Sequence, residues 1–227
     1  MMIENSMQVR KVALFRAVIV AATILASSYT VRAHPHVFVD GGVDFVISEA
    51  GQFTTIQVTW RYDAFETLYL LSEMNVSPAP SSDFSDAERE KVESTLGRFP
   101  PDFDGSVHIA LVGAPVALQD PRNLAARMVG DRLEITFLRD LEIPIDVRGQ
   151  KLNIGFYERT YFFAFSLTDA PDVRGAADQC SYEMTPFDAS AQSDEVLQEL
   201  AKLGREETPE DNNIGATLAD RMVVPCS

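Results

Sequence analysis

The sequence predicts an α+β protein that is mainly β, an antiparallel β-sandwich-like body carrying two or three short helices. Two observations lead to this expectation. Several short segments alternate apolar and polar residues and are joined in pairs by turn residues, which is typical of β-hairpins. Between them, capping residues begin helical patterns. With 227 residues, the chain is long enough to bury one sizeable core.

An apolar segment near the N-terminus is typical of a secretory signal peptide. Arg10, Lys11 and Arg16 form its positive region, and residues 17–26 are an apolar run that is too short to span a bilayer. Small residues follow at the positions of a cleavage site. We therefore expect residues 1–33 to be a signal peptide.

Cleavage near Ala33 would leave residues 34–227 as a single β-rich domain in the periplasm, with a helical insertion at about residues 63–97. An uncleaved N-terminal anchor is the alternative, and Met7 is an alternative start to Met1 with a more usual positive region. No second long apolar run follows, so we do not expect the mature chain to span a membrane.

The charge of the mature chain narrows the choice of partner. The chain contains 19 Lys and Arg residues and 34 Asp and Glu residues. Removal of residues 1–33 takes four basic residues and one acidic residue with it, which leaves a net charge of −18. A surface of this charge repels nucleic acid and anionic lipid, so we expect neither as a partner.

The mature chain is expected to begin with a β-hairpin. Residues 34–48 and 53–62 alternate in polarity on either side of a turn at residues 49–52. The pair Gly41-Gly42 predicts a bulge or a bend in the first strand. One face of this strand carries His34, His36, Phe38 and Asp40.

Helices are predicted where capping residues precede helical spacing. Capping-box spacing begins the first two helices, at Asp63–Glu66 and Ser85–Glu88, and the second helix continues to about Leu96. A loop rich in proline and serine, residues 75–82, separates them. A third helix is predicted at Ser193–Leu203, which is rich in Glu and Leu.

From Gly105 onwards the pattern returns to β-strands in hairpin pairs. The predicted pairs are residues 107–112 with 114–118, residues 123–129 with 132–138, and residues 151–157 with 161–167. A short strand is expected within residues 175–184. Residues 221–226 are predicted to end the chain as a short strand or an extended tail.

Two cysteines, Cys180 and Cys226, lie in the mature chain. One cysteine pair in an exported protein most often forms a disulfide, which here would tie the C-terminal tail to the body. Two free thiols are the alternative. A metal or redox role is disfavoured because the spacing is not CxxC.

Catalytic motifs are absent from the sequence. It contains no GxxxxGK[ST], no GxGxxG after a strand, no GxSxG and no HExxH. The chain has three histidines, and no serine lies in a pattern that suggests a nucleophile turn. We therefore do not expect an enzyme.

His34 and His36 are the candidate metal ligands. Residues two apart on a strand project from one face with their bases about 7 Å apart, so both imidazoles can bind one nickel, cobalt, zinc or copper ion. Cleavage after Ala33 would add the free amine of His34 as a ligand. Pro35 has no amide N–H, which excludes the square-planar mode that uses a deprotonated second amide.

Asp40, on the same face, and Asp63 are weaker candidate ligands. One alternative is that both histidines of the pair face water at a frayed N-terminus, because a tight site usually needs three or four ligands. Another is that Asp63 only caps a helix. His108 is expected to be a partly buried strand histidine rather than a third ligand.

Aromatic residues are concentrated in residues 156–165. At strand periodicity, core packing explains at least half of them. Tyr157 and Tyr161 flank the turn between the two predicted strands and are candidates for an exposed interaction surface.

Several motifs together resemble a known family. They are AHPHVFVD at residues 33–40, VTWRYDAF at residues 58–65, GFYERTYFFAFSL at residues 155–167, and the late cysteine pair. The chain is similar in these to the bacterial periplasmic family of unknown function catalogued as an uncharacterised ABC-type transport system, periplasmic component. The resemblance implies an exported protein that is associated with nickel/cobalt-type permeases, and hence a metal-handling accessory role.

Two departures from the family pattern bear on its sites. Many members carry a calcium-type loop rich in aspartate and glycine after the first helix, whereas residues 75–90 lack a DxDxDG pattern, so we do not expect calcium there. The family turn YDPTY is YERTY at residues 157–161, where the proline is lost.

We therefore expect an exported accessory protein of a membrane transport system that binds or hands over a divalent transition metal. The alternative is a metal-free periplasmic module that docks on a transporter permease through its aromatic edge and acidic face. The first would depend on His34 and His36, and the second on Tyr157 and Tyr161.

Overall fold

The computed structural model describes residues 35–79, 82–100, 103, 105–175, 180–188, 190, 194–203, 207, 209 and 211–227. All of them belong to one compact unit that runs from residue 33 to the C-terminus. The predicted signal peptide and His34 lie outside the described residues. No helix within the described part is long and apolar enough to cross a membrane.

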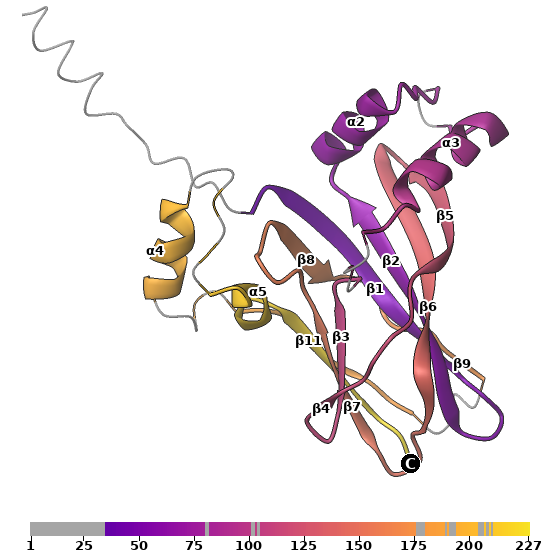
Figure 1. The fold of residues 1–227 in the computed structure, drawn as a ribbon, viewed down its shortest axis with the longest axis vertical. Helices are drawn as coiled ribbons and strands as arrows, with labels where there is room; N and C mark the ends of the chain where they lie inside the picture. The colour runs from indigo at the N-terminus through magenta and orange to yellow at the C-terminus, as the bar shows by residue number, and fades with distance from the viewer. Residues whose placement is uncertain are drawn as a thin grey trace, which may run out of the picture. The chain divides into compact units, whose positions relative to one another are not determined.

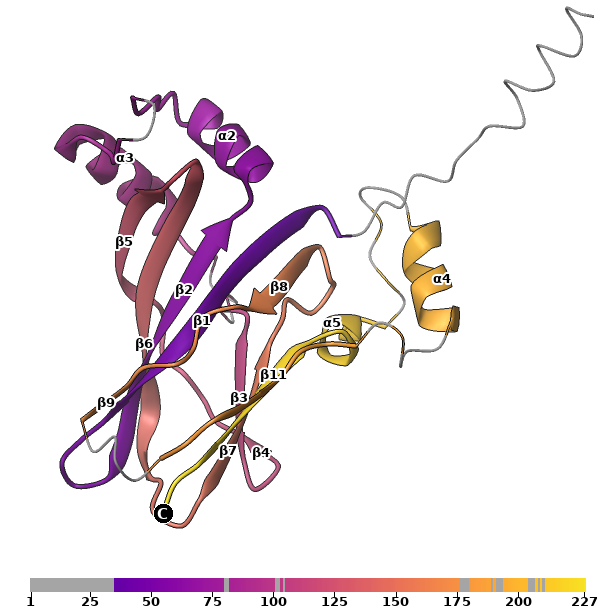
Figure 2. The ribbon, with the colours of Figure 1, turned by 180° about the vertical axis from the view of Figure 1, so that it is seen from behind.

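Two β-sheets form the body (Figures 1 and 2). Sheet A consists of β1 (Val37–Ile47), β2 (Gln52–Tyr62), β5 (Arg122–Val129), β6 (Arg132–Asp146), β8 (Phe163–Leu167) and β9 (Val173–Gly175). Its order is β5-β6-β2-β1-β8, and β9 also pairs with β1. Sheet B has the order β10-β11-β7-β3-β4. Its strands are β3 (Val107–Leu111), β4 (Ala114–Pro115), β7 (Lys151–Phe156), β10 (Glu183–Thr185) and β11 (Asp220–Pro225).

Four short helices accompany the sheets in the described residues. They are α2 (Ala64–Glu73), α3 (Asp86–Leu96), α4 (Asp194–Lys202) and α5 (Ile214–Thr217). The prediction of a mainly β α+β fold with a sandwich-like body is confirmed. The sequence pattern does not predict α5, which is a single turn whose Asn213 cap makes no side-chain hydrogen bond.

The core lies between the two sheets and is rich in aromatic rings. Trp60 of β2 contacts Phe137 of β6 and Phe165 of β8, with ring centroids 5.4 and 5.1 Å apart. Phe165 in turn lies 4.9 Å from Phe156 of β7. Alternate residues of β1 and β2 are buried, as the period-2 pattern predicts. These contacts join sheet A to sheet B.

Three of the four predicted hairpins are confirmed, since β1 pairs with β2, β3 with β4 and β5 with β6. The predicted pairing of residues 151–157 with 161–167 is wrong. β7 belongs to sheet B, whereas β8 pairs in parallel with β1 of sheet A. The Glu158 carboxylate accepts the N–H groups of Thr160 and Phe162, so the connection crosses between sheets and does not fold back as a hairpin.

The predicted bulge at Gly41-Gly42 is also wrong. The register between β1 and β2 is unbroken from Val39 to Val46, and the irregularity lies between Val46 and Ile47. A Cβ at Gly41 would lie 1.9 Å from the carbonyl oxygen of Thr59. Close approach of the neighbouring backbone therefore explains this glycine.

The predicted capping patterns begin both α2 and α3. The Asp63 carboxylate accepts the N–H of Glu66 at 2.8 Å. Ser85 and Glu88 form a reciprocal capping box. Both helices lie at the end of sheet A where β2 ends and β5 turns into β6 (Figures 1 and 2).

Cys180 and Cys226 form the predicted disulfide. The two residues also pair as an isolated β-bridge, and the N–H of Ser181 donates to the carbonyl of Pro225. The disulfide therefore fastens the end of β11, which lies between β10 and β7 in sheet B, to the segment that precedes β10.

Replacement of both cysteines should destabilise the protein, because the unfolded chain gains conformational entropy without the disulfide. The disulfide closes a loop with a sequence separation of 46 residues. A loop of this length predicts a loss of about 4 kcal/mol in the free energy of unfolding for Cys180→Ser/Cys226→Ser. Urea denaturation measures it, and wild-type protein under reductant should match the variant. An unchanged urea midpoint in the variant would contradict this stabilising role of the disulfide.

Candidate functional site

The start of β1 is held by the segment that precedes β8. The N–H groups of His36 and Val37 both donate to the carbonyl of Phe162, at 3.0 and 3.3 Å. The ring of His36 also lies against the ring of Phe162, with centroids 4.9 Å apart. The backbone and ring of His36 are therefore fixed, in contrast to the frayed end considered from the sequence.

Asp63 connects the start of β1 to α2. One oxygen of its carboxylate caps the helix at Glu66, and the other accepts the N–H of Phe38 at 3.4 Å. Phe38 is two residues beyond His36, so His36 and Asp63 lie at the same end of β1. The capping role considered from the sequence is present.

Asp40 is engaged by an arginine. Its carboxylate lies 2.6 Å from Nη1 of Arg132. The Nη2 and Nε groups of the same guanidinium donate to the carbonyls of Arg61 and Tyr62. A metal at Asp40 would have to displace this guanidinium. Of the four predicted ligands, His36 and Asp63 thus lie at the same end of β1. Asp40 is paired with Arg132, and His34 lies outside the described residues. The described residues contain no group of three or more His, Cys, Asp or Glu placed to hold a metal ion.

The outer face of sheet A carries a row of ion pairs beside Asp40. Glu134 of β6 is buried and accepts from Arg61 of β2 at 2.7 Å and from Arg127 of β5 at 2.5 Å. Arg61 also pairs with Asp169 at 3.1 Å, and hydrogen bonding to Asp169 raises the pKa of the guanidinium above its ordinary value. The charges in this row neutralise one another across strands, which is a structural role.

Tyr157 and Tyr161 are half-buried rather than exposed. The ring of Tyr157 stacks on His108, with centroids 3.9 Å apart, which agrees with the prediction of a strand histidine at that position. Tyr161 packs beside Leu200 and Ile214, and burial raises the pKa of its phenol. Both tyrosines therefore take part in packing, and among the described residues a more exposed aromatic surface lies elsewhere.

That surface is one face of α2. Phe65, Leu68 and Tyr69 are 77%, 69% and 54% exposed, while Thr67 and Leu71 on the opposite face are buried. Phe65, Leu68 and Tyr69 have helical spacing in the sequence, but this spacing does not tell which face of the helix is buried. The signal available in the sequence is that large apolar residues surround most of this helix, more than one packed face requires.

A groove of about 770 Å³ runs beside this face. It lies between α2, the loop that follows it and the turn from β5 to β6. Apolar side chains line much of it, and they include Leu68, Leu71, Val76, Pro78 and Met128. The exposed face of α2 and this groove share Leu68, so together they make a continuous apolar surface.

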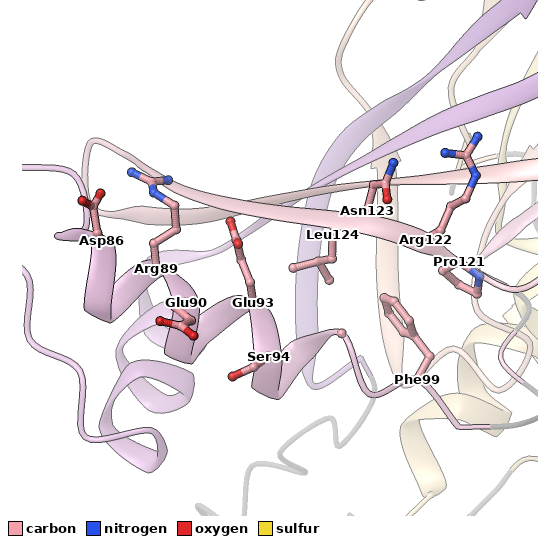
Figure 3. A pocket seen from close by; sticks show the side chains of 11 residues that line it. Asp86, Arg89, Glu90, Glu93, Ser94, Phe99, Pro121, Arg122, Asn123 and Leu124 are labelled. Atoms are coloured by element: carbon pink, nitrogen blue, oxygen red, sulfur yellow. The ribbon is translucent and has the colours of Figure 1, made fainter.

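A second cleft, of about 490 Å³, lies between α3 and the edge of β5 (Figure 3). Here α3 and the residues before it take the place of a neighbouring strand. The Glu93 carboxylate accepts the N–H of Ala126 and the Asp83 carboxylate that of Met128, both at 2.9 Å, and Arg89 donates to the carbonyl of Ala126. These side chains protect an edge strand from pairing with other chains.

The two arginines and Glu93 that line this second cleft are engaged in such contacts. Arg89 pairs with Asp83 at 2.8 Å, and Arg122 pairs with Asp140 at 2.7 Å. The hydrogen bond from Arg89 is the largest cause that lowers the pKa of Asp83 to about 2. The cleft is therefore a by-product of edge protection, and the surface at α2 is the stronger candidate site.

The ion pair at Asp83 predicts a pH dependence. Its pKa is about 2 in the folded protein against an ordinary value of 3.8, so its stabilising effect is present above about pH 4 and is lost as the pH falls towards 2. Asp83→Asn removes the charge but keeps an oxygen that can accept the N–H of Met128. Thermal melts should show a lower Tm for this variant at pH 6 and a difference that vanishes near pH 2. A difference that does not change with pH would contradict this role.

A family model described as a protein of unknown function (DUF1007) matches residues 19–226. No curated protein matches the chain. Among solved structures, the chain is similar to AChBP from Bulinus truncatus, with 10% sequence identity over 86% of this chain and 87% of that one and a TM-score of 0.32.

Proposed function

The chain belongs to this DUF1007 family of unknown function, and we propose that it is an exported accessory protein that docks on a membrane transporter. The observation that carries the proposal is the exposed apolar face of α2, formed by Phe65, Leu68 and Tyr69. Such a patch on a protein surface marks an interaction site.

Exposure of these three side chains leaves free energy that a partner can recover. Burial of a large apolar side chain contributes about 1.5–3 kcal/mol of stabilising free energy. Three neighbouring side chains of α2 stay largely exposed in the isolated chain, so most of this free energy is not gained. A partner that covers them recovers this free energy. Since Thr67 and Leu71 already hold the helix to the body, the exposed face is not needed for folding.

Export and the transporter partner have separate support. The signal-like residues 1–33 and the disulfide between Cys180 and Cys226 favour an oxidising compartment such as the periplasm. The resemblance of the AHPH and YERTY segments to a transport-associated family favours a membrane transporter as the partner.

Handover of a divalent transition metal is the second candidate function. It is favoured by the fixed position of His36 at the start of β1 and by the nearby carboxylate of Asp63. His34, which precedes Pro35 directly, would supply the second imidazole and, after cleavage, the free amine. Nickel, cobalt, zinc and copper all accept these ligands.

Docking predicts that polar substitutions on α2 release the protein from membranes. Phe65→Ser/Leu68→Ser should weaken saturable cosedimentation with native membrane vesicles at least tenfold, because the apolar contact is lost. Ile143→Ser is the matched control, since Ile143 is 76% exposed and lies on β6. Protease treatment of the vesicles should abolish binding. Equal binding by wild-type protein and the α2 variant would refute docking through this face.

Metal handover predicts stoichiometric binding by protein that is exported and processed naturally, with its N-terminus read by mass spectrometry. His34→Ala/His36→Ala should abolish binding, and affinity should fall below about pH 6 as the imidazoles protonate. Asp40→Asn should leave the affinity unchanged, because Arg132 already holds that carboxylate. Titration with nickel, cobalt, zinc and copper measures the stoichiometry and the affinity. Equal metal binding by the double histidine variant would exclude this function.

A further inference from the structure

The chain segment that contains α2 carries charge of one sign. Residues 62–88 contain no Lys, Arg or His, and their acidic residues are Asp63, Glu66, Glu73, Asp83, Asp86 and Glu88. The arginines on either side are engaged elsewhere, since Arg61 pairs with Glu134 and Asp169 and Arg89 pairs with Asp83. In the described part of the chain, no Lys or Arg forms an ion pair with Glu66, Glu73 or Asp131.

The carboxylates of Glu66, Glu73 and Asp131 lie on both sides of the exposed apolar face of α2. Glu66 and Glu73 are seven residues apart, about two helical turns, so they lie on the same side of α2. That side borders the apolar row of Phe65, Leu68 and Tyr69. The groove lies on the other flank, and Asp131 lines it.

The apolar face has the spacing of a helix-packing seam. Phe65, Leu68, Tyr69 and Ser72 are related as i, i+3, i+4 and i+7, and Leu68 and Ser72 border the groove. The ten residues of α2 span about 15 Å, which matches two to three turns of a second helix. The hydrogen-bonded backbone of α2 offers no open edge to an extended peptide.

We infer that α2 and its groove bind a basic amphipathic helix of the partner, with its apolar face on Phe65, Leu68 and Tyr69. Lys or Arg side chains of that helix pair with Glu66 and Glu73 on one side and with Asp131 on the other. This recognition is a helix-in-groove mode with charge complementarity at the rim. The inference rests on the proposed docking function and names the chemistry of its partner.

Two synthetic helical peptides with the same leucine face test this inference, one with lysine and one with glutamate on the polar face. Fluorescence anisotropy of each labelled peptide is measured with the full mature protein. The Leu/Lys peptide should bind at least tenfold more tightly than the Leu/Glu peptide. Leu68→Ser should weaken its binding tenfold or more, whereas Ile143→Ser should leave it unchanged.

The contribution of the acidic rim needs its own control, because the whole protein is acidic and attracts cations. Glu66→Gln/Glu73→Gln should weaken binding of the Leu/Lys peptide and reduce its salt dependence. The matched double variant Glu49→Gln/Glu142→Gln removes two exposed carboxylates elsewhere and should have little effect. Equal weakening by both double variants, or equal binding of both peptides, would overturn the inference.

The two proposals can fail separately. If neither peptide binds while the α2 variants still lose membrane association, docking stands and the basic helix is excluded. If the Leu/Lys peptide binds through Leu68 but the α2 variants keep their membrane association, the helix site stands and the docking function fails. Saturable binding of the protein to phosphatidylcholine vesicles through Phe65 and Leu68 would assign the surface to lipid and overturn the inference.

Discussion

Packing of aromatic rings between the two sheets is the interaction on which the rest of the structure depends. Trp60 contacts Phe137 and Phe165 within sheet A, and Phe165 reaches Phe156 of sheet B. Because α2 begins two residues after β2 ends at Tyr62, this packing also determines where α2 lies. Thr67 of α2 then accepts the N–H of Leu133, which fastens the buried side of the helix to β6 and leaves its other side exposed.

Several carboxylates of this acidic protein are neutralised within the fold. On sheet A, Glu134 pairs with Arg61 and Arg127, and Asp140 pairs with Arg122. Beside α2, in contrast, Glu66, Glu73 and Asp131 form no ion pair with a Lys or Arg among the described residues. An uncompensated acidic rim beside an apolar face is consistent with a site that is completed by another molecule.

The two proposed functions share one end of the molecule. The hydrogen bond from Phe38 to Asp63 joins the start of β1, where His36 lies, to the first turn of α2. A metal held by His36 would therefore lie at the same end of β1 as a partner docked on α2. Docking and metal handover are physically compatible, and docking could position a bound metal for transfer.

The sequence by itself determined the mainly β class, three hairpins, the caps of α2 and α3 and the cysteine pair, because periodicity, turn residues and capping spacing are local signals. Only the tertiary structure decided that β8 pairs in parallel with β1, that Arg132 holds Asp40, and that Phe65, Leu68 and Tyr69 face outward. Local patterns identify apolar and charged residues. Which of them are buried or paired depends on contacts between segments far apart in the chain, and these follow from packing of the two sheets.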